Sequence, residues 1–236
     1  MSEFPAKHAS PAKNKLFVIA FRTGALLFSV WGIMSIAGIF KNAFNPVILL
    51  AYTVQSNMLT AVFFGILLTK TVLPISGRGK QIESLEKPYG FSPRLSAFVA
   101  FAIFVTMLVY WFILVPTMTE RTRSLLALDN LAVHLITPLL MLFDYILFTE
   151  RGKLKKHDPL LCAIIPYVYL LEALTLGLTH SVRYDSLGIH SYYPYIFLDI
   201  DLFGPWVILM VAAITLFFLA TAFFWRHLDK KLGQRG

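Results

Sequence analysis

Long apolar runs separated by short polar segments cover almost the whole chain. A helix needs roughly 20 mostly apolar residues to cross the hydrocarbon core of a bilayer. Six segments meet this requirement, namely 16–40, 46–72, 95–116, 127–149, 159–179 and 204–225. The pattern therefore predicts an all-α integral membrane protein with a polar N-terminal tail (1–15), a six-helix transmembrane domain (16–226) and a C-terminal tail (227–236).

Composition supports the same class. Hydrophobic residues make up 57% of the chain and charged residues only 14%, whereas soluble domains carry about 25% charged residues. The first apolar run is too long for the core of a signal peptide and has no small-residue cleavage site behind it, so we expect a retained helix. Because Cys162 is the one cysteine, an internal disulfide is excluded.

Basic residues are distributed unevenly between the two sides of the predicted bundle. With the N-terminus placed in the cytoplasm, 17 of the 21 Lys and Arg residues lie on the cytoplasmic side. The others are Lys41, Arg121, Arg123 and Arg183. Since cytoplasmic loops are enriched in Lys and Arg, both termini are predicted to be cytoplasmic. The net charge of +8 then faces anionic lipid headgroups, and no nucleic-acid partner is needed to explain it.

The second span carries a cluster of polar residues in an otherwise apolar run. Within "YTVQSNML" stand Thr53, Gln55, Ser56 and Asn57. A lone hydroxyl is inexpensive in a membrane helix because it can bond to a carbonyl one turn back. Four polar side chains together indicate either bonds to neighbouring helices or a polar pocket.

The predicted orientation of the helices allows the depth of a residue in the membrane to be estimated from its position in the sequence. Counted from the outer helix ends, Thr53, His134 and Glu172 all lie roughly 10–12 Å deep. Asn57 lies one turn below Thr53, and Asn130 one turn above His134. A lone membrane Thr is usually a packing residue, whereas an intramembrane His or Glu indicates function by default. A purely structural pair of His134 with Glu172 stays open as an alternative.

Three further features accompany this layer. Pro138 follows His134 by one turn, so it frees the His134 carbonyl and can bend the helix. Arg22 and Asp144 lie at matching depths near the inner side, which favours a structural ion pair over a role in proton transfer. The longest outer loop contains His180 and Arg183 and has the length of a lid over an outer-leaflet pocket.

These residue types fit acyl transfer. A Thr hydroxyl is a weak nucleophile until a base removes its proton, and a neutral His can do so and later protonate the leaving alkoxide. A third group, Glu172 or Asn130, would orient the imidazole. Asn57 would stabilise an oxyanion. The substrate would be a lipid ester that enters sideways between helices.

Three motifs resemble one known family. "YTVQSN", "NLAVHLITPLLMLFDYILF" and "YPYIFLDID" together resemble the six-helix androgen-induced membrane hydrolases, relatives of the androgen-dependent regulator of tissue factor pathway inhibitor. The resemblance covers most of the chain, and the third motif is most similar to the bacterial branch. In that family a Thr of the second helix and a His of the fourth are the proposed catalytic pair, and members hydrolyse fatty acid esters of hydroxy fatty acids. The resemblance thus implies a lipid ester hydrolase with Thr53 and His134 as catalytic residues, in a bacterial inner membrane.

Some of the same residues would fit other functions. His134 and His180 are the membrane-level candidates for haem ligation, but they differ in depth by roughly 12 Å. A proton-coupled transporter would use Glu172, Asp144 and Arg22. The segment "ISGRG" (75–79) resembles a serine protease motif but falls in a basic loop far from His134. We expect no metal and no cofactor. The expected partners are the lipid substrate and the membrane lipids, and the sequence does not indicate an oligomeric state.

Overall fold

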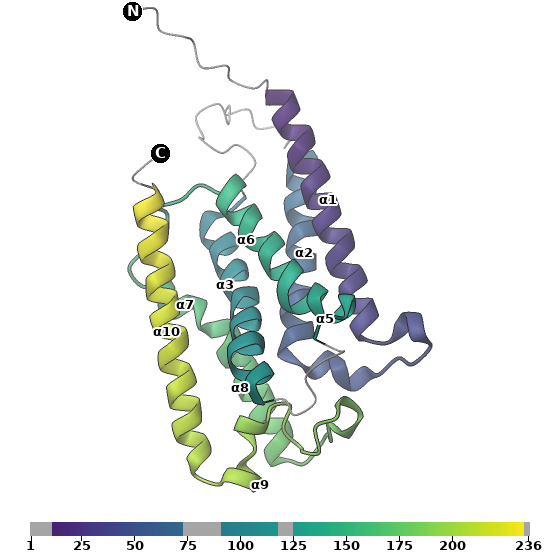
Figure 1. Cartoon of the computed structure of the whole chain (residues 1–236). Helices are drawn as coiled ribbons and strands as arrows, with labels where there is room; N and C mark the ends of the chain where they lie inside the picture. The colour runs from purple at the N-terminus through teal and green to yellow at the C-terminus, as the bar shows by residue number, and fades with distance from the viewer. Residues whose placement is uncertain (1–10, 73–90, 118–124, 234–236) are drawn as a thin grey trace, which may run out of the picture.

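The computed structural model describes residues 11–72, 91–117 and 125–233, and these form a helical bundle (Figure 1). Residues 1–10, the 75–79 segment, and Arg121 and Arg123 lie outside the described part. Six helices are long and apolar enough to cross a membrane, which confirms the predicted class of an α-helical, multi-pass membrane protein. Their main helical elements are α1 (Pro11–Ile36), α2 (Tyr52–Val72), α3 (Pro93–Val109), α6 (Thr137–Phe148), α8 (Ile164–Leu178) and α10 (Trp206–Gly233).

Three of the six spans are composite. The third continues from α3 through the π-helical turn η3 (Tyr110–Leu114) into α4 (Val115–Thr117). The fourth begins with α5 (Leu128–Leu131), passes through the π-helical turn η4 (Ala132–Ile136) and continues as α6. The fifth begins with α7 (Asp158–Cys162) and continues as α8. Because π-helical turns are rare and gather at functional sites, η3 and η4 direct attention to this part of the bundle.

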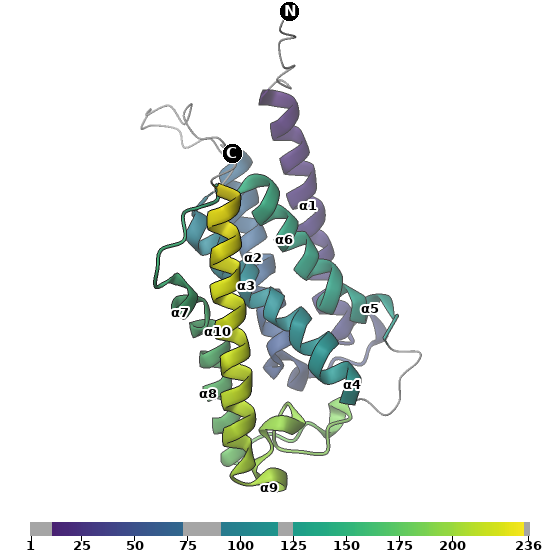
Figure 2. The same ribbon diagram turned by 60° about the vertical axis from the view of Figure 1, so that its left-hand side comes forward.

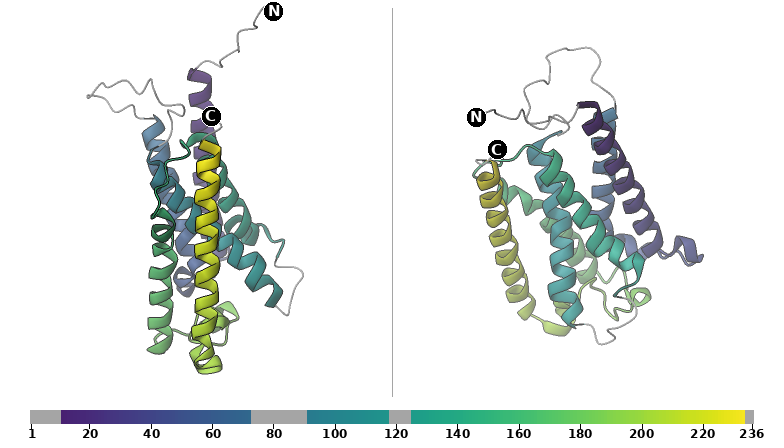
Figure 3. Two further views of the ribbon diagram at one scale, coloured as in Figure 1. Left: turned by 90° about the vertical axis from the view of Figure 1, so that its left-hand side faces the viewer. Right: turned by 45° about the horizontal axis from the view of Figure 1, so that its top comes forward.

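The bundle has two distinct ends. The start of α1 and the end of α10 lie at the same end, termed here the terminal end (Figure 1). At the opposite end, termed the loop end, the segment 179–205 folds under the helices (Figure 2). This segment contains the short helices η5 (Asp185–Leu187), η6 (Ile196–Leu198) and α9 (Ile200–Phe203). Figure 3 shows α1 and α10 at opposite edges of the bundle.

The start of the second span differs from the prediction. Asn45 and Pro46 open a separate 3₁₀ helix, η2 (Pro46–Leu50), in which the Asn45 side chain accepts a hydrogen bond from the Val47 N–H at 3.1 Å. Ala51 is extended (φ −82°, ψ 136°), so α2 begins only at Tyr52. Thr53 therefore lies in the first turn of α2, and the depth predicted for it from a helix starting at residue 46 was wrong.

The first and sixth spans also end differently from the prediction. The first helix stops at Ile36, because Gly38 adopts a left-handed conformation (φ 79°) and the chain turns there. The sixth helix runs on to Gly233 instead of ending near 225. Buried Asp229 fixes this extension by accepting hydrogen bonds from the Tyr145 hydroxyl at 2.6 Å and the Gly152 N–H at 3.0 Å.

A buried ion pair ties three helices together near the terminal end. The Arg22 Nε donates to Asp144 Oδ2 at 2.7 Å and its Nη2 donates to Asp144 Oδ1 at 3.0 Å. Its Nη1 donates to the Thr71 hydroxyl at 2.6 Å. Both charged side chains are 0% exposed. The predicted structural pairing of Arg22 with Asp144 is confirmed.

We expect Asp144→Asn to lower the free energy of unfolding by about 3–5 kcal/mol, because it leaves the Arg22 charge buried without its counter-ion. The measurement is chemical or thermal unfolding of the purified protein in detergent. Asp185→Asn is the control, since Asp185 forms an exposed pair with Arg183 and such pairs contribute little to stability. Equal losses in the two variants would contradict the assigned role of the buried pair.

Candidate functional site

The first turn of α2 places a hydroxyl against an imidazole of the fourth span. The Thr53 Oγ1 lies 3.2 Å from the His134 Nε2. Thr53 is partly exposed, whereas His134 is buried with 8% of its surface exposed. The structure thus brings together the two residues that the sequence placed in one layer.

The second nitrogen of His134 fixes the imidazole tautomer. The His134 Nδ1 lies 3.1 Å from the main-chain carbonyl oxygen of Asn130. A carbonyl only accepts hydrogen bonds, so Nδ1 carries the proton and Nε2 presents its lone pair to the Thr53 hydroxyl. The imidazole is therefore arranged as a base toward Thr53. The orienting group is the Asn130 backbone, whereas its side chain donates to the Leu125 carbonyl at 3.0 Å.

The π-helical turn η4 holds the His134 ring in place. Pro138 has no N–H to offer the His134 carbonyl, which instead accepts from the Trp111 indole N–H at 3.1 Å. The Tyr110 ring stacks on the imidazole with 3.6 Å between ring centroids. Gly32 of α1 lets η4 pack closely, since a Cβ at Gly32 would lie 2.9 Å from the Ala132 Cβ. The predicted release of the His134 carbonyl by Pro138 is confirmed.

Asn57 connects α2 to the fourth span. Its amide donates to the Thr53 carbonyl at 2.7 Å and to the Val133 carbonyl at 2.9 Å. Both amide hydrogens are thereby used, so Asn57 fixes the spacing between Thr53 and His134 and has no donor left for an oxyanion. Ser56 makes the corresponding link to α3, with 2.6 Å between its hydroxyl and that of Thr106.

Glu172 belongs to a separate contact on the α8 side of α2. Its carboxylate oxygens accept from the Gln55 amide at 2.9 and 3.1 Å. The alternative of a His134–Glu172 pair was therefore wrong, because successive α2 side chains point in different directions and Gln55 and Thr53 face different helices. Glu172 does not orient the imidazole.

His180 and Arg183 lie in the exposed part of the loop end. His180 Nε2 is 3.0 Å from Asp201 Oδ2, and the Arg183 Nε donates to Asp185 Oδ2 at 2.7 Å. Their partners are acidic residues of the same segment, so the structure does not bring these two candidates to Thr53 and His134. The segment itself is anchored on the bundle: buried Tyr193 packs where Gly177 of α8 leaves room for its ring.

Sequence reasoning missed the contribution of Tyr195. Tyr195 lines the same cavity as Tyr52, the residue before Thr53, and its phenol interacts with Tyr169, with the Thr53 side chain and with the backbone N–H groups of Tyr52 and Thr53. Burial raises the pKa of Tyr195 to about 12, so the phenol stays protonated at neutral pH. The break at Ala51 exposes these two N–H groups, because the first N–H groups of a helix have no partner within it. The motif "YPYIFLDID" contains Tyr195, but nothing in the sequence distinguishes it from the neighbouring tyrosines.

No known protein family, characterised protein or solved structure matched this chain. The site is therefore interpreted from its own geometry. A hydroxyl, a correctly protonated imidazole and a group of hydrogen-bond donors converge at the start of α2. Among the described residues, no group of His, Cys, Asp and Glu side chains is arranged to hold a metal ion.

We expect Asn57→Leu to lower the free energy of unfolding by about 1–3 kcal/mol, because two backbone carbonyls inside the bundle each lose one hydrogen bond. Thermal unfolding in detergent measures this loss. Met58→Leu on the neighbouring, exposed position is the control and should leave stability almost unchanged, since the swap conserves volume. Unchanged stability of Asn57→Leu would refute the bridging role of the amide.

Proposed function

We propose that this protein is an intramembrane lipid ester hydrolase with Thr53 as nucleophile and His134 as general base. The supporting observation is the 3.2 Å contact between Thr53 Oγ1 and His134 Nε2, with the tautomer fixed by the Asn130 carbonyl. The three motifs that resemble the androgen-induced membrane hydrolases favour the same activity. By that resemblance, the substrates are fatty acid esters such as those of hydroxy fatty acids.

The first half-reaction transfers the acyl group to the enzyme. The Thr53 oxygen attacks the ester carbonyl carbon while His134 Nε2 takes the hydroxyl proton. The tetrahedral intermediate collapses when the bond from carbon to the alcohol oxygen breaks, and His134 returns the proton to that oxygen. The products of this step are the free alcohol and an acyl ester on Thr53.

The second half-reaction regenerates the enzyme. Water attacks the acyl-Thr53 carbonyl while His134 Nε2 accepts one of its protons. The bond to the Thr53 oxygen then breaks, the same proton passes to that oxygen, and a fatty acid leaves. Both intermediates carry a negative oxygen, and the donors beside Thr53 are the N–H groups of Tyr52 and Thr53 and the Tyr195 hydroxyl.

The setting of the site favours a substrate delivered by the membrane. Thr53 belongs to a helix long and apolar enough to span the bilayer, and exposed large apolar side chains cover the outside of the bundle. The asymmetry of Lys and Arg supports cytoplasmic termini and places the start of α2 in the outer leaflet. We assign the protein to a bacterial inner membrane on the resemblance to the bacterial branch.

Thr53→Val should reduce ester hydrolysis by at least about 10²-fold, because it removes the nucleophile while keeping the side-chain shape, and His134→Asn should cause a similar loss. Release of fatty acid from a fatty acid ester of a hydroxy fatty acid in detergent micelles measures the activity. Thr60→Val is the matched control on the same helix, since buried Thr60 bonds only to the Ser56 carbonyl of its own helix.

Labelling identifies the nucleophile independently. A fluorophosphonate probe should modify Thr53 in the unaltered protein, as mapped by peptide mass spectrometry, and should fail to label His134→Asn. Modification at another residue, or full turnover by Thr53→Val, would reject the proposed chemistry.

Tyr195→Phe should lower kcat by about 10–10²-fold with little change in KM, because Tyr195 is one of several donors to the oxyanion. Since the Tyr195 pKa is raised to about 12, its hydroxyl keeps its proton throughout pH 6–9. The ratio of wild-type to variant kcat should therefore stay constant over this range. Tyr192→Phe in the same segment is the control, and an equal effect there would indicate a general disturbance of the loop end.

A further inference from the structure

We propose that the apolar cavity between α3, α8, α10 and the 179–205 segment binds the acyl chain of the substrate and sets its preferred length. This inference rests on the proposed esterase function, since it names the place where one half of that substrate lies. It adds a binding site on α10, a helix that contributes nothing to the Thr53–His134 pair.

The cavity contains about 580 Å³ of empty space, including its open mouth. Only about 70 Å³ of this space can hold the centre of a water-sized molecule, so the cavity is narrow. Residues from four spans and from the loop end line it, among them Tyr52 of α2, Val105 of α3, Tyr169 of α8, Ile214 of α10 and Tyr195 of the loop end. None of them carries a charge at neutral pH.

The chemistry of the lining selects an apolar occupant. The Tyr52 hydroxyl donates to the Ala102 carbonyl at 3.0 Å, and the Tyr169 hydroxyl donates to the Leu50 carbonyl at 3.2 Å. These two hydroxyls are satisfied by backbone, so the residues contribute mainly ring surface to the wall. A charged ligand would lose its hydration here and meet no group of opposite charge, whereas an alkyl chain loses nothing.

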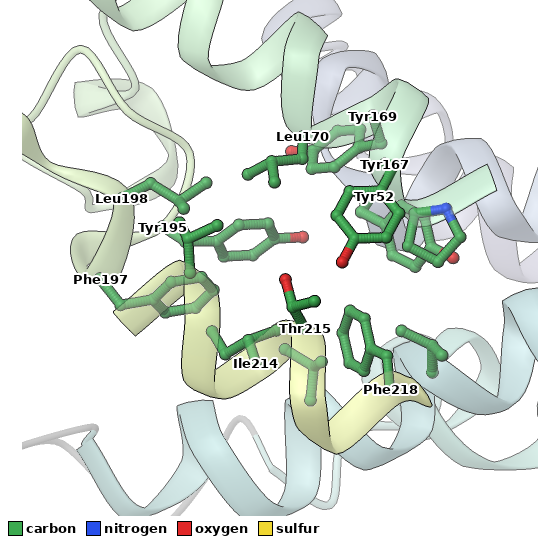
Figure 4. A pocket seen from close by; sticks show the side chains of 14 residues that line it. Tyr52, Tyr167, Tyr169, Leu170, Tyr195, Phe197, Leu198, Ile214, Thr215 and Phe218 are labelled. Atoms are coloured by element: carbon green, nitrogen blue, oxygen red, sulfur yellow. The ribbon is translucent and has the colours of Figure 1, made fainter. Parts of the chain in front are cut away.

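The cavity borders the site at one wall. Tyr195 lines it, and the hydroxyls of Tyr195 and Thr215 point toward its interior (Figure 4). Tyr52, which directly precedes Thr53 in α2, lines the same cavity, and the Tyr195 phenol interacts with the Thr53 side chain. A carbonyl held at Thr53 would therefore have its own acyl chain beginning at Tyr195 and continuing between α8 and α10. This continuity identifies the occupant as the acyl chain of the ester.

The test fills the cavity from α10. Ile214→Trp introduces a large ring among the lining residues, and Ile208→Trp makes the identical change on the same helix at a position 71% exposed to the outside of the bundle. Hydrolysis of p-nitrophenyl butyrate and p-nitrophenyl palmitate is compared, because these esters differ only in the acyl chain. We expect Ile214→Trp to lower the palmitate-to-butyrate ratio of kcat/KM by about 10-fold or more, and Ile208→Trp to leave it unchanged. An unchanged ratio in Ile214→Trp would overturn the proposal.

A binding measurement separates this proposal from the catalytic one. Palmitic acid with a terminal diazirine is photo-crosslinked to the full-length Thr53→Val protein, which needs no turnover. Adducts should map to the cavity-facing positions of α10 and α3, should decrease with excess palmitate and should disappear in Thr53→Val/Ile214→Trp. Adducts confined to outward positions such as Ile208 would overturn the cavity assignment while leaving the catalytic pair intact. Cavity adducts together with a fully active Thr53→Val would reject only the proposed nucleophile.

Discussion

Polar side chains within a membrane helix are stabilised when they find partners inside the protein, and this constraint organises the first turns of α2. Four polar side chains lie within five residues there, and each contacts a different residue of a neighbouring span. Thr53 meets His134, Gln55 meets Glu172, Ser56 meets Thr106, and the Asn57 amide bridges to the Val133 carbonyl. Because the partners lie on the third, fourth and fifth spans, these contacts hold three neighbours around one helix.

The arrangement of the candidate site follows from this packing. The Asn57 amide and the Thr53 hydroxyl both contact η4, so the bond that joins the helices also sets the geometry of the proposed catalytic pair. The Arg22–Asp144 pair joins α1 to α6 nearer the terminal end. The fourth span is therefore held at two levels, and the π-helical turn between them supplies the irregularity that turns His134 toward α2. The Asn57 hydrogen bond therefore has a structural role and also positions the two groups of the proposed reaction.

The sequence was sufficient for the six spans and for the pairing of Arg22 with Asp144, and it singled out Thr53 and His134, which the structure brings into contact. Apolar length and the high cost of isolated charge in lipid are strong, local signals. The break at Ala51 and the π-helical turn at 132–136 were not predictable, since each arises from tertiary packing that overrides a good helical pattern. The direction in which each side chain points from its helix was also not predictable. Depth alone therefore did not indicate that Glu172 pairs with Gln55. The position of Tyr195 was not predictable for a similar reason, because the loop conformation decides which tyrosine side chain faces the bundle.

Because α2 begins only at Tyr52, Thr53 lies close to one end of its span. With 21 residues at 1.5 Å each, α2 is roughly 30 Å long, which matches the thickness of the hydrocarbon layer. With α2 spanning that layer, Thr53, its second residue, would stand at the boundary between acyl tails and headgroups. Carbonyl groups of glycerolipids reside at that same boundary, and solvent penetrates to it. The proposed hydrolysis would then draw its ester from the lipid side and its water from the headgroup side.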